Sequence, residues 1–217
     1  KGRLDADILI ESKRLNIKNL RGSVIKDALN VDWQIAGLIG LNAALPIDLT
    51  VQTQAQVDST KLRSNVIIDG TLMPLALGVK LDSKGYEPSI GPVDFEVQAS
   101  VDIERVQLDS LRGTLLGGML DGQVVYHTHA DSLLVQFRLQ QLELAKLPQS
   151  PMAGQLDFEL IADLSLTTER YVAQLDLNMH DLDLLADKPL DVQLTARLDP
   201  DHRLEVTLDA PLGHLEA

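Results

Sequence analysis

The sequence contains no cysteine and is short of basic residues. Without cysteine, disulfides, thiolate metal sites and a cysteine nucleophile are excluded. The 19 Lys and Arg residues stand against 32 Asp and Glu residues, so the formal net charge is −13. Nucleic-acid binding needs a basic surface that displaces the counterions of phosphate groups. We therefore expect no nucleic-acid partner.

Aromatic residues are also scarce. They make up 3% of the chain, whereas hydrophobic residues make up 45%, and 41 Leu residues accompany only 3 Phe, 3 Tyr and 1 Trp. The chain has enough apolar residues to fold, and its apolar surface is aliphatic. The 23 Asp residues outnumber the 9 Glu residues. Because Asp is the poorer helix former, this balance disfavours helix.

The N-terminal residues lack the charged, apolar and small-residue regions of a signal peptide. No apolar run approaches the length of about 18 residues that a membrane-spanning helix needs. We therefore expect no transmembrane segment in this chain. Strand-like alternation is already under way at Leu4, directly after Lys1-Gly2-Arg3, which predicts an internal segment of a longer protein.

Apolar and polar residues alternate along most of the chain, the pattern of strands with one buried and one solvated face. Turn signals at residues 83–88 with 91–92, and at 199–202, separate such strands, and only the sequence GLIGLNAA at 37–44 could form a short helix. The loops are short, so we expect one all-β unit over residues 1–217, with about fifteen or more antiparallel strands. The alternating runs lie at 4–10, 31–35, 47–57, 66–68, 75–81, 93–103, 124–126, 135–139, 156–166, 175–179, 192–198 and 204–208.

An internal repeat relates residues 4–35 to residues 95–126, at an offset of 91 positions. The best-matched part aligns RLNIKNLRGS, which starts at Arg14, with RVQLDSLRGT, which starts at Arg105. A degraded third copy of its Φ-x-Φ-x-x-Leu spacing, where Φ is apolar, falls at Leu142, Leu144 and Leu147. Repeats built from strands stack in one dimension, and each unit needs its neighbours to cover its apolar face.

His127, His129 and Asp131 are the strongest metal-ligand pattern in the chain. On a strand, however, residues two apart diverge by nearly 7 Å, whereas metal ligands converge at about 2 Å from one ion. A solvated polar face explains the three residues better, and we expect no metal site. Aspartate pairs such as Asp5/Asp7, Asp181/Asp183 and Asp199/Asp201 recur because Asp is abundant on alternating strands, where charge keeps exposed strands from pairing with other chains.

Other catalytic patterns are isolated. The Ser-x-x-Lys at 23–26 lacks the companion elements of penicillin-recognising enzymes. The glycine-rich run at 117–122 has predicted strands on both sides and no helix to hold a phosphate, so a tight bend or bulge between strands is expected there. We expect neither a cofactor nor enzymatic activity.

A sheet with one apolar face must cover it, either in a dry sandwich of two sheets or in one long curved sheet that leaves an elongated groove. Composition alone favours the sandwich. A groove with an aliphatic lining suits acyl chains, which need apolar area and no directional partners. From the alternation, the predicted lining residues are Val31, Trp33, Ile35, Ile47, Leu49, Val51, Phe95, Val97, Val101, Ile103, Val124, Tyr126, Val135, Phe137, Leu139, Leu156, Phe158, Leu160, Leu175, Leu177, Val192 and Leu194.

Three segments share a recognisable texture: the repeated Leu-Arg-Gly-Ser/Thr at 20–23 and 111–114, the run LRGTLLGGMLDG at 111–122, and the tail HRLEVTLDAPLG at 202–213. These segments resemble the TamB family of the AsmA-like superfamily, the inner-membrane subunits of translocation and assembly modules. The resemblance implies an elongated, curved antiparallel sheet folded like a taco around a hydrophobic groove. It also shifts the choice of architecture from the sandwich to the open sheet.

The resemblance further implies a periplasmic location, in a parent protein that is anchored in the inner membrane of a Gram-negative bacterium. Family members cooperate with an Omp85-type outer-membrane barrel and are implicated in phospholipid transport and outer-membrane protein assembly. The expected function is a non-enzymatic conduit that shields phospholipid acyl chains in the groove. The alternatives are a chaperone or scaffold that templates strands of outer-membrane β-barrels or autotransporters, and a plain structural β-sandwich or solenoid.

Overall fold

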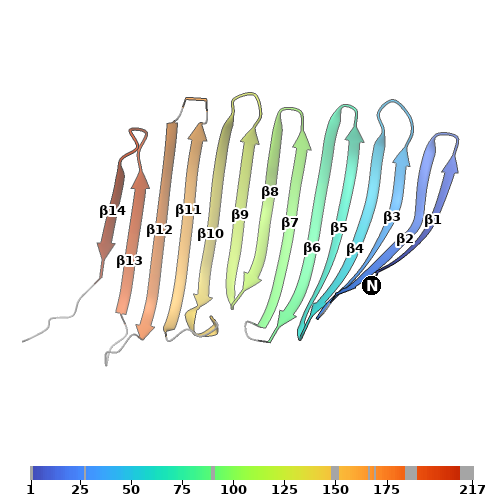
Figure 1. The fold of residues 1–217 in the computed structure, drawn as a ribbon. Helices are drawn as coiled ribbons and strands as arrows, with labels where there is room; N and C mark the ends of the chain where they lie inside the picture. Colours follow the sequence, from blue (N-terminus) through green and yellow to red (C-terminus); the bar gives the residue numbers. More distant parts are fainter. Residues whose placement is uncertain are drawn as a thin grey trace, which may run out of the picture.

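The computed structural model describes residues 2–26, 28–88, 91–147, 152–165, 167–168, 170–183 and 190–210. These residues form one antiparallel sheet of fourteen strands in which the spatial order is the chain order, β1 to β14 (Figure 1). The sheet is open at both edges, because β1 pairs only with β2 and β14 pairs only with β13. The predicted all-β class and elongated, curved antiparallel sheet are confirmed.

Strands β1 to β12 have ten to fourteen residues each. The first seven strands are β1 (Gly2–Glu11), β2 (Arg14–Lys26), β3 (Leu29–Gly40), β4 (Pro46–Val57), β5 (Thr60–Leu72), β6 (Leu75–Glu87) and β7 (Gly91–Asp102). The next three are β8 (Arg105–Leu115), β9 (Gly118–His127) and β10 (Ser132–Glu143), followed by the short 3₁₀ helix η1 (Leu144–Lys146). The last four are β11 (Ala153–Ser165), β12 (Arg170–Asp183), β13 (Leu190–Leu198) and β14 (Leu204–Asp209).

Short turns connect consecutive strands, and two of the predicted turns are confirmed. Leu116 and Gly117 join β8 to β9 with φ values of 53° and 82°, as a tight hairpin requires. In the β13–β14 turn, the Asp199 carboxylate accepts hydrogen bonds from the backbone N–H groups of Asp201 (2.9 Å) and Arg203 (2.8 Å).

Two local predictions need correction. The predicted turn within 83–92 does separate β6 from β7 but is shorter, because residues 83–87 continue strand β6, where Gly85 takes a place in the ladder opposite Leu62 and Val93, and β7 begins at Gly91. The possible helix at 37–44 is absent, since Gly37 to Gly40 end strand β3. In both segments the pairing with neighbouring strands decides the structure. Leu166 and the Pro211-Leu212-Gly213 end of the tail lie outside the described residues.

The Φ-x-Φ-x-x-Leu spacing coincides with a β-bulge at four places. There, two residues of the strand stand opposite one residue of its partner, and the final Leu returns to the face of the first two apolar residues. The predicted third copy is misplaced, because Leu144 lies in η1. The four places are 15/17/20 in β2, 106/108/111 in β8, 137/139/142 in β10 and 177/179/182 in β12. The same spacing at 4/6/9 in β1 and 33/35/38 in β3 has no extra residue in that strand.

The two copies of the repeat lie on β1–β3 and β7–β9. Their bulges occur at equivalent places: the register shifts between Asp7 and Ile8 in the first copy and between Gln98 and Ala99 in the second. Bulges strengthen the local twist of a sheet. The repeat therefore introduces the same distortion at two points along the stack.

The sheet is a single layer throughout the described residues, so the sandwich alternative is wrong. Its surface area is 14533 Å², whereas a compact monomer of this mass has about 9,900 Å². Among the described residues, every large side chain is at least 2% exposed. The aliphatic residues thus gather on one face without forming a closed core.

One small buried cluster covers part of this face at one end of β10 and β12. Here η1 turns back over the sheet, and Leu144 packs with Leu116, Leu142 and Leu182, each at most 5% exposed. The backbone N–H of Glu143 donates to the carbonyl oxygen of Leu116 (3.1 Å) and fixes the turn. We call this group the rim cluster.

Truncation of the rim cluster should destabilise the sheet more than truncation of an exposed leucine. We expect Leu182→Ala to lower the free energy of unfolding by about 2–5 kcal/mol, because it leaves a cavity at a site that is 2% exposed. Leu134→Ala, at a site that is 42% exposed, is the matched control and should cost about 0.5 kcal/mol. Urea unfolding followed by circular dichroism measures both, and equal losses would contradict the cluster's role.

Asp102 holds the turn between β7 and β8. Its carboxylate accepts hydrogen bonds from the backbone N–H groups of Glu104 (2.8 Å) and Arg105 (2.9 Å), and these bonds lower its pKa. A lowered pKa in the folded state means that the charged carboxylate stabilises the fold above the pKa of the unfolded chain, and that this stability is lost as pH falls through the folded value.

We therefore expect Asp102→Asn to be less stable than the wild type at pH 7, where the wild-type carboxylate is charged. The difference should shrink as the pH is lowered below the usual aspartate range, because Asp102 then becomes neutral as well. Thermal unfolding over a series of pH values measures this, and a difference that stays constant down to the acid limit would contradict it.

Candidate functional site: an open apolar face

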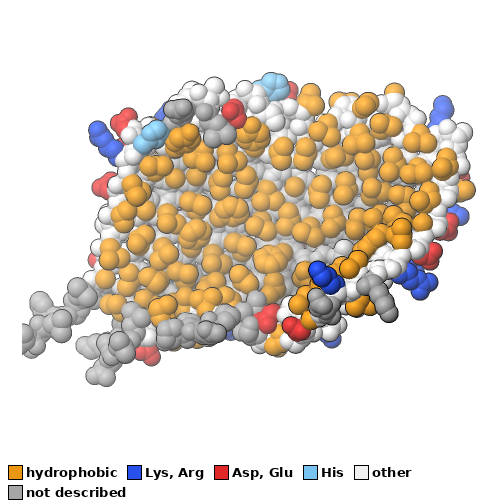
Figure 2. All heavy atoms as spheres, viewed as in Figure 1, with side chains coloured by type: hydrophobic (Ala, Val, Ile, Leu, Met, Phe, Trp, Pro, Cys, Tyr) orange, Lys and Arg blue, Asp and Glu red, His pale blue; other side chains and the backbone are white. Residues whose placement is uncertain are grey.

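One row of residues crosses all fourteen strands without a polar side chain. Each member is the direct cross-strand partner of the next, so all of them point to the same side of the sheet. Figure 2 shows the hydrophobic side chains gathered on one face of the sheet. This apolar row consists of Ala6, Leu20, Ile35, Val51, Val66, Leu81, Val97, Leu111, Gly122, Phe137, Leu160, Leu175, Ala196 and Val206.

All of the predicted lining residues except Ile103 lie on this side of the sheet, in the apolar row or in neighbouring rows. Ile103 lies in the β7–β8 turn and is 64% exposed, because β7 ends at Asp102. Tyr126 lies at the end of β9 and donates a hydrogen bond from its hydroxyl to Asp131 (2.8 Å), which raises the pKa of Tyr126. We call this side of the sheet the apolar face.

The opposite side, the polar face, carries a matching row without an aliphatic side chain. Opposite charges face each other along parts of it, and Arg138 donates a hydrogen bond to Glu159 (2.6 Å), which raises the pKa of Arg138. Its members are Asp5, Arg21, Gln34, Gln52, Asn65, Asp82, Glu96, Arg112, Asp121, Arg138, Glu159, Asp176, Thr195 and Thr207.

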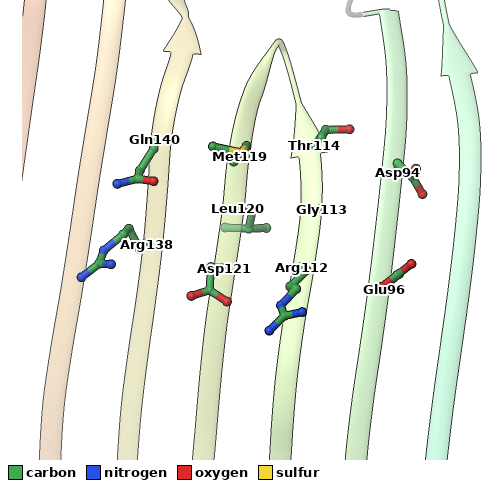
Figure 3. Close-up of a pocket in the computed structure, with 10 residues that line it drawn as sticks. All are labelled: Asp94, Glu96, Arg112, Gly113, Thr114, Met119, Leu120, Asp121, Arg138 and Gln140. Atoms are coloured by element: carbon green, nitrogen blue, oxygen red, sulfur yellow. The ribbon is translucent and has the colours of Figure 1, made fainter.

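Shallow hollows also lie on the polar face. Figure 3 shows one of about 430 Å³, where Glu96, Arg112, Asp121 and Arg138 project from consecutive strands. A second hollow of about 550 Å³ is lined by residues at positions 3, 5 and 21–23, which correspond to positions 94, 96 and 112–114 of the first at the repeat offset of 91. These two hollows thus occupy equivalent places in the two copies of the repeat.

The residues weighed as metal ligands do not form a site. His127 ends β9, while His129 and Asp131 lie in the following turn, where Asp131 accepts from Tyr126. Within the described parts of the chain, no group of three or more His, Asp or Glu residues is placed to hold a metal ion.

Sequence reasoning missed a polar interruption of the apolar face. Thr53, Ser64 and Ser83 are direct cross-strand neighbours on β4, β5 and β6, in the row next to the apolar row. The Oγ atoms of Ser64 and Ser83 are 2.8 Å apart and hydrogen-bonded. In the sequence, each of three successive strands has a hydroxyl residue at a position where the alternation expects an apolar one. That these three residues are neighbours can be recognised only when the register of the strands is known.

The fold defines an all-β protein built as one open antiparallel sheet with one apolar and one polar side. Comparison with protein-family models, with curated proteins and with solved structures finds no match to the chain. Among the residues that the structure describes, no helix has the length and apolar character needed to cross a membrane.

An open apolar face should bind a hydrophobic fluorescent dye in the native state. We expect strong anilinonaphthalene sulfonate fluorescence from the folded chain, and a clear decrease in the double variant Val51→Glu/Leu81→Glu, which places charges in the apolar row. The matched control Gln52→Glu/Lys80→Glu alters the polar face of the same strands and should keep the signal. A wild-type signal no larger than that of a compact globular protein would contradict the open face.

Proposed function

We propose that this chain is a non-enzymatic segment of a lipid conduit, in which the apolar face shields phospholipid acyl chains from water. The observation that carries the proposal is the apolar row, which continues from β1 to β14 without a polar side chain. A conduit needs such continuity, because an acyl chain that moves along it must not meet a polar barrier.

The dimensions of the sheet support the same function. Thirteen spacings of about 4.8 Å give the row a length of about 62 Å, and strands of ten to fourteen residues give the face a height of about 33–46 Å. An acyl chain occupies one leaflet of a bilayer, about 15 Å of its hydrocarbon thickness of about 30 Å. The face is therefore large enough to cover several acyl chains along its length.

The energetics favour an apolar occupant. Each methylene group that leaves water contributes about 0.8 kcal/mol, and the single-layer sheet has a surface about half as large again as that of a compact protein of its mass. Bulk lipid requires no specific polar partner, which agrees with a face that is almost uniformly aliphatic.

The proposal extends to the setting that the family resemblance implies. We propose that the chain is an internal periplasmic segment of a TamB-like protein, whose parent is anchored in the inner membrane and acts with an Omp85-type outer-membrane barrel in phospholipid transport and outer-membrane biogenesis. The open curved sheet with one apolar face agrees with the architecture that the resemblance implies.

A second candidate function is strand templating for outer-membrane β-barrel proteins. It would use an edge strand of the sheet, whose outer backbone groups can pair with an incoming strand. Photocrosslinking separates the two functions. Lipid adducts at Val97 or Phe137 favour the conduit, whereas β-barrel adducts at β1 favour templating.

A charge on the apolar face should expel lipid locally. We expect Val97→Asp and Phe137→Arg to reduce lipid that copurifies with the chain, because a charge within hydrocarbon costs about 2.5–3.5 kcal/mol, on the order of a hundredfold in binding. The controls Gln98→Asp and Gln136→Arg place the same charges on the polar face of the same strands and should leave the lipid content unchanged.

Native mass spectrometry and lipid extraction measure the bound lipid in each variant. The conduit proposal fails if the wild type carries no acyl lipid, or if Val97→Asp and Phe137→Arg bind as much lipid as their polar-face controls.

A further inference from the structure

The hydroxyl residues Thr53, Ser64 and Ser83 occupy a bounded position on the apolar face. Their row continues to Trp33 on β3 at one end and to Phe95 on β7 at the other, each as the direct cross-strand partner of the next residue. The three hydroxyl residues therefore form a polar site three strands wide with an aromatic side chain at each end. We call it the hydroxyl notch.

The two aromatic rings lean away from the notch. A Cβ atom added at Gly22 on β2 would lie 2.2 Å from the Trp33 ring, and one added at Gly113 on β8 would lie 2.4 Å from the Phe95 ring. The Trp33 ring thus covers β2 and the Phe95 ring covers β8, each on the side away from the hydroxyl groups. The short Thr and Ser side chains are left between two large side chains that do not cover them.

The hydroxyl groups of the notch have unused hydrogen-bonding capacity. Ser83 is buried at 6% exposure, and its only partner among the described residues is Ser64. The pair contains two hydroxyl hydrogens but shares one hydrogen bond, so one donor has no described acceptor. The Thr53 hydroxyl also bonds to no described residue. A buried donor without an acceptor is destabilising. If acyl chains cover the notch and exclude water, a ligand that supplies a hydrogen-bond acceptor to these hydroxyl groups is therefore favoured.

The position of the notch indicates how such an occupant would lie. Ser64 is four residues from the start of β5 and eight from its end, or about 13 Å and about 26 Å. The longer side accommodates an acyl chain of about 15 Å, and the shorter side carries Ala55, Leu62 and Gly85 in the row next to the notch. The longer side is lined by Ile47, Leu49, Val51, Val66, Ile68, Leu77, Val79 and Leu81.

We propose that the hydroxyl notch binds the acyl carbonyl oxygens of a lipid, with the acyl chain lying toward the Leu72 end of β5 and the headgroup toward Thr60. This assignment rests on the proposed lipid function and adds an orientation and a preferred position to it. In this arrangement Ser83 donates to Ser64, and the hydroxyl groups of Ser64 and Thr53 donate to the carbonyl oxygens.

Photocrosslinking with labelled lipid tests the proposal on the folded chain. One probe is a phosphatidylethanolamine with a diazirine next to the acyl carbonyl, and the other carries the diazirine near the methyl end of the same chain. In the wild type we expect the first probe to label peptides of β4–β6 around the notch, and the second to label residues nearer Leu72. A free fatty acid with the first label distinguishes an ester from a carboxylate as the source of the carbonyl oxygen.

The variant Thr53→Val/Ser64→Ala/Ser83→Ala removes both donors and should lower labelling of the notch by the first probe by at least the roughly two- to tenfold factor that one hydrogen bond supplies. Total bound lipid, measured by native mass spectrometry, should change much less. Ser64→Thr keeps a hydroxyl group and should keep the labelling, and Thr195→Val/Thr207→Val is the control on the polar face. Thr53→Val alone leaves the Ser64–Ser83 bond intact and should shift the labelling in the same direction.

The outcomes separate the two proposals. If the wild type binds lipid but the first probe labels the whole face evenly, or if removal of the hydroxyl groups leaves its labelling unchanged, the notch assignment is wrong and the conduit stands. If the wild type binds no lipid, both are wrong.

Discussion

The register between neighbouring strands is the constraint on which the rest of the structure depends. Successive side chains of a strand point to opposite sides, so a slip of one residue would exchange the apolar and polar sides of that strand. The pairing is kept across thirteen strand pairs, and as a result two rows, one apolar and one polar, run unbroken from β1 to β14. Bulges do not disturb this order, since each sets two residues against one and returns the following Leu to the apolar face.

The two faces hold the sheet in register by different means. On the polar face, Arg138 and Glu159 attract each other as direct partners, although the register also places the like charges of Asp82 and Glu96 opposite each other. On the apolar face the side chains are chemically similar, so the register there is selected by keeping polar residues on the opposite side. The polar face thus adds a few specific pairs that the aliphatic face lacks.

Much of the fold could be predicted from the sequence, because alternation is a local signal. It placed nearly all of the strands and, apart from Ile103, the side of the sheet on which each proposed lining residue lies. Whether a second sheet covers the apolar face is not a local property, and composition alone favoured the wrong architecture. Gly85 was taken for part of a turn because the same residue serves in turns and in tightly paired strands. The hydroxyl notch escaped notice because Thr53, Ser64 and Ser83 are far apart in the sequence and meet only through the register.

The strictly sequential order of the strands has a consequence for how the chain reaches this structure. Each strand is hydrogen-bonded only to the strands before and after it in the sequence, so every pairing closes a short loop and the contact order is low. Folding can start at any hairpin and spread outward, as in other repeat proteins. A chain delivered from its N-terminus can add each strand to a growing edge as it arrives, and local opening of one hairpin leaves the distant ones intact. The sheet is thus a linear series of hairpins, and its strands can pair in the order in which the chain is synthesised or exported.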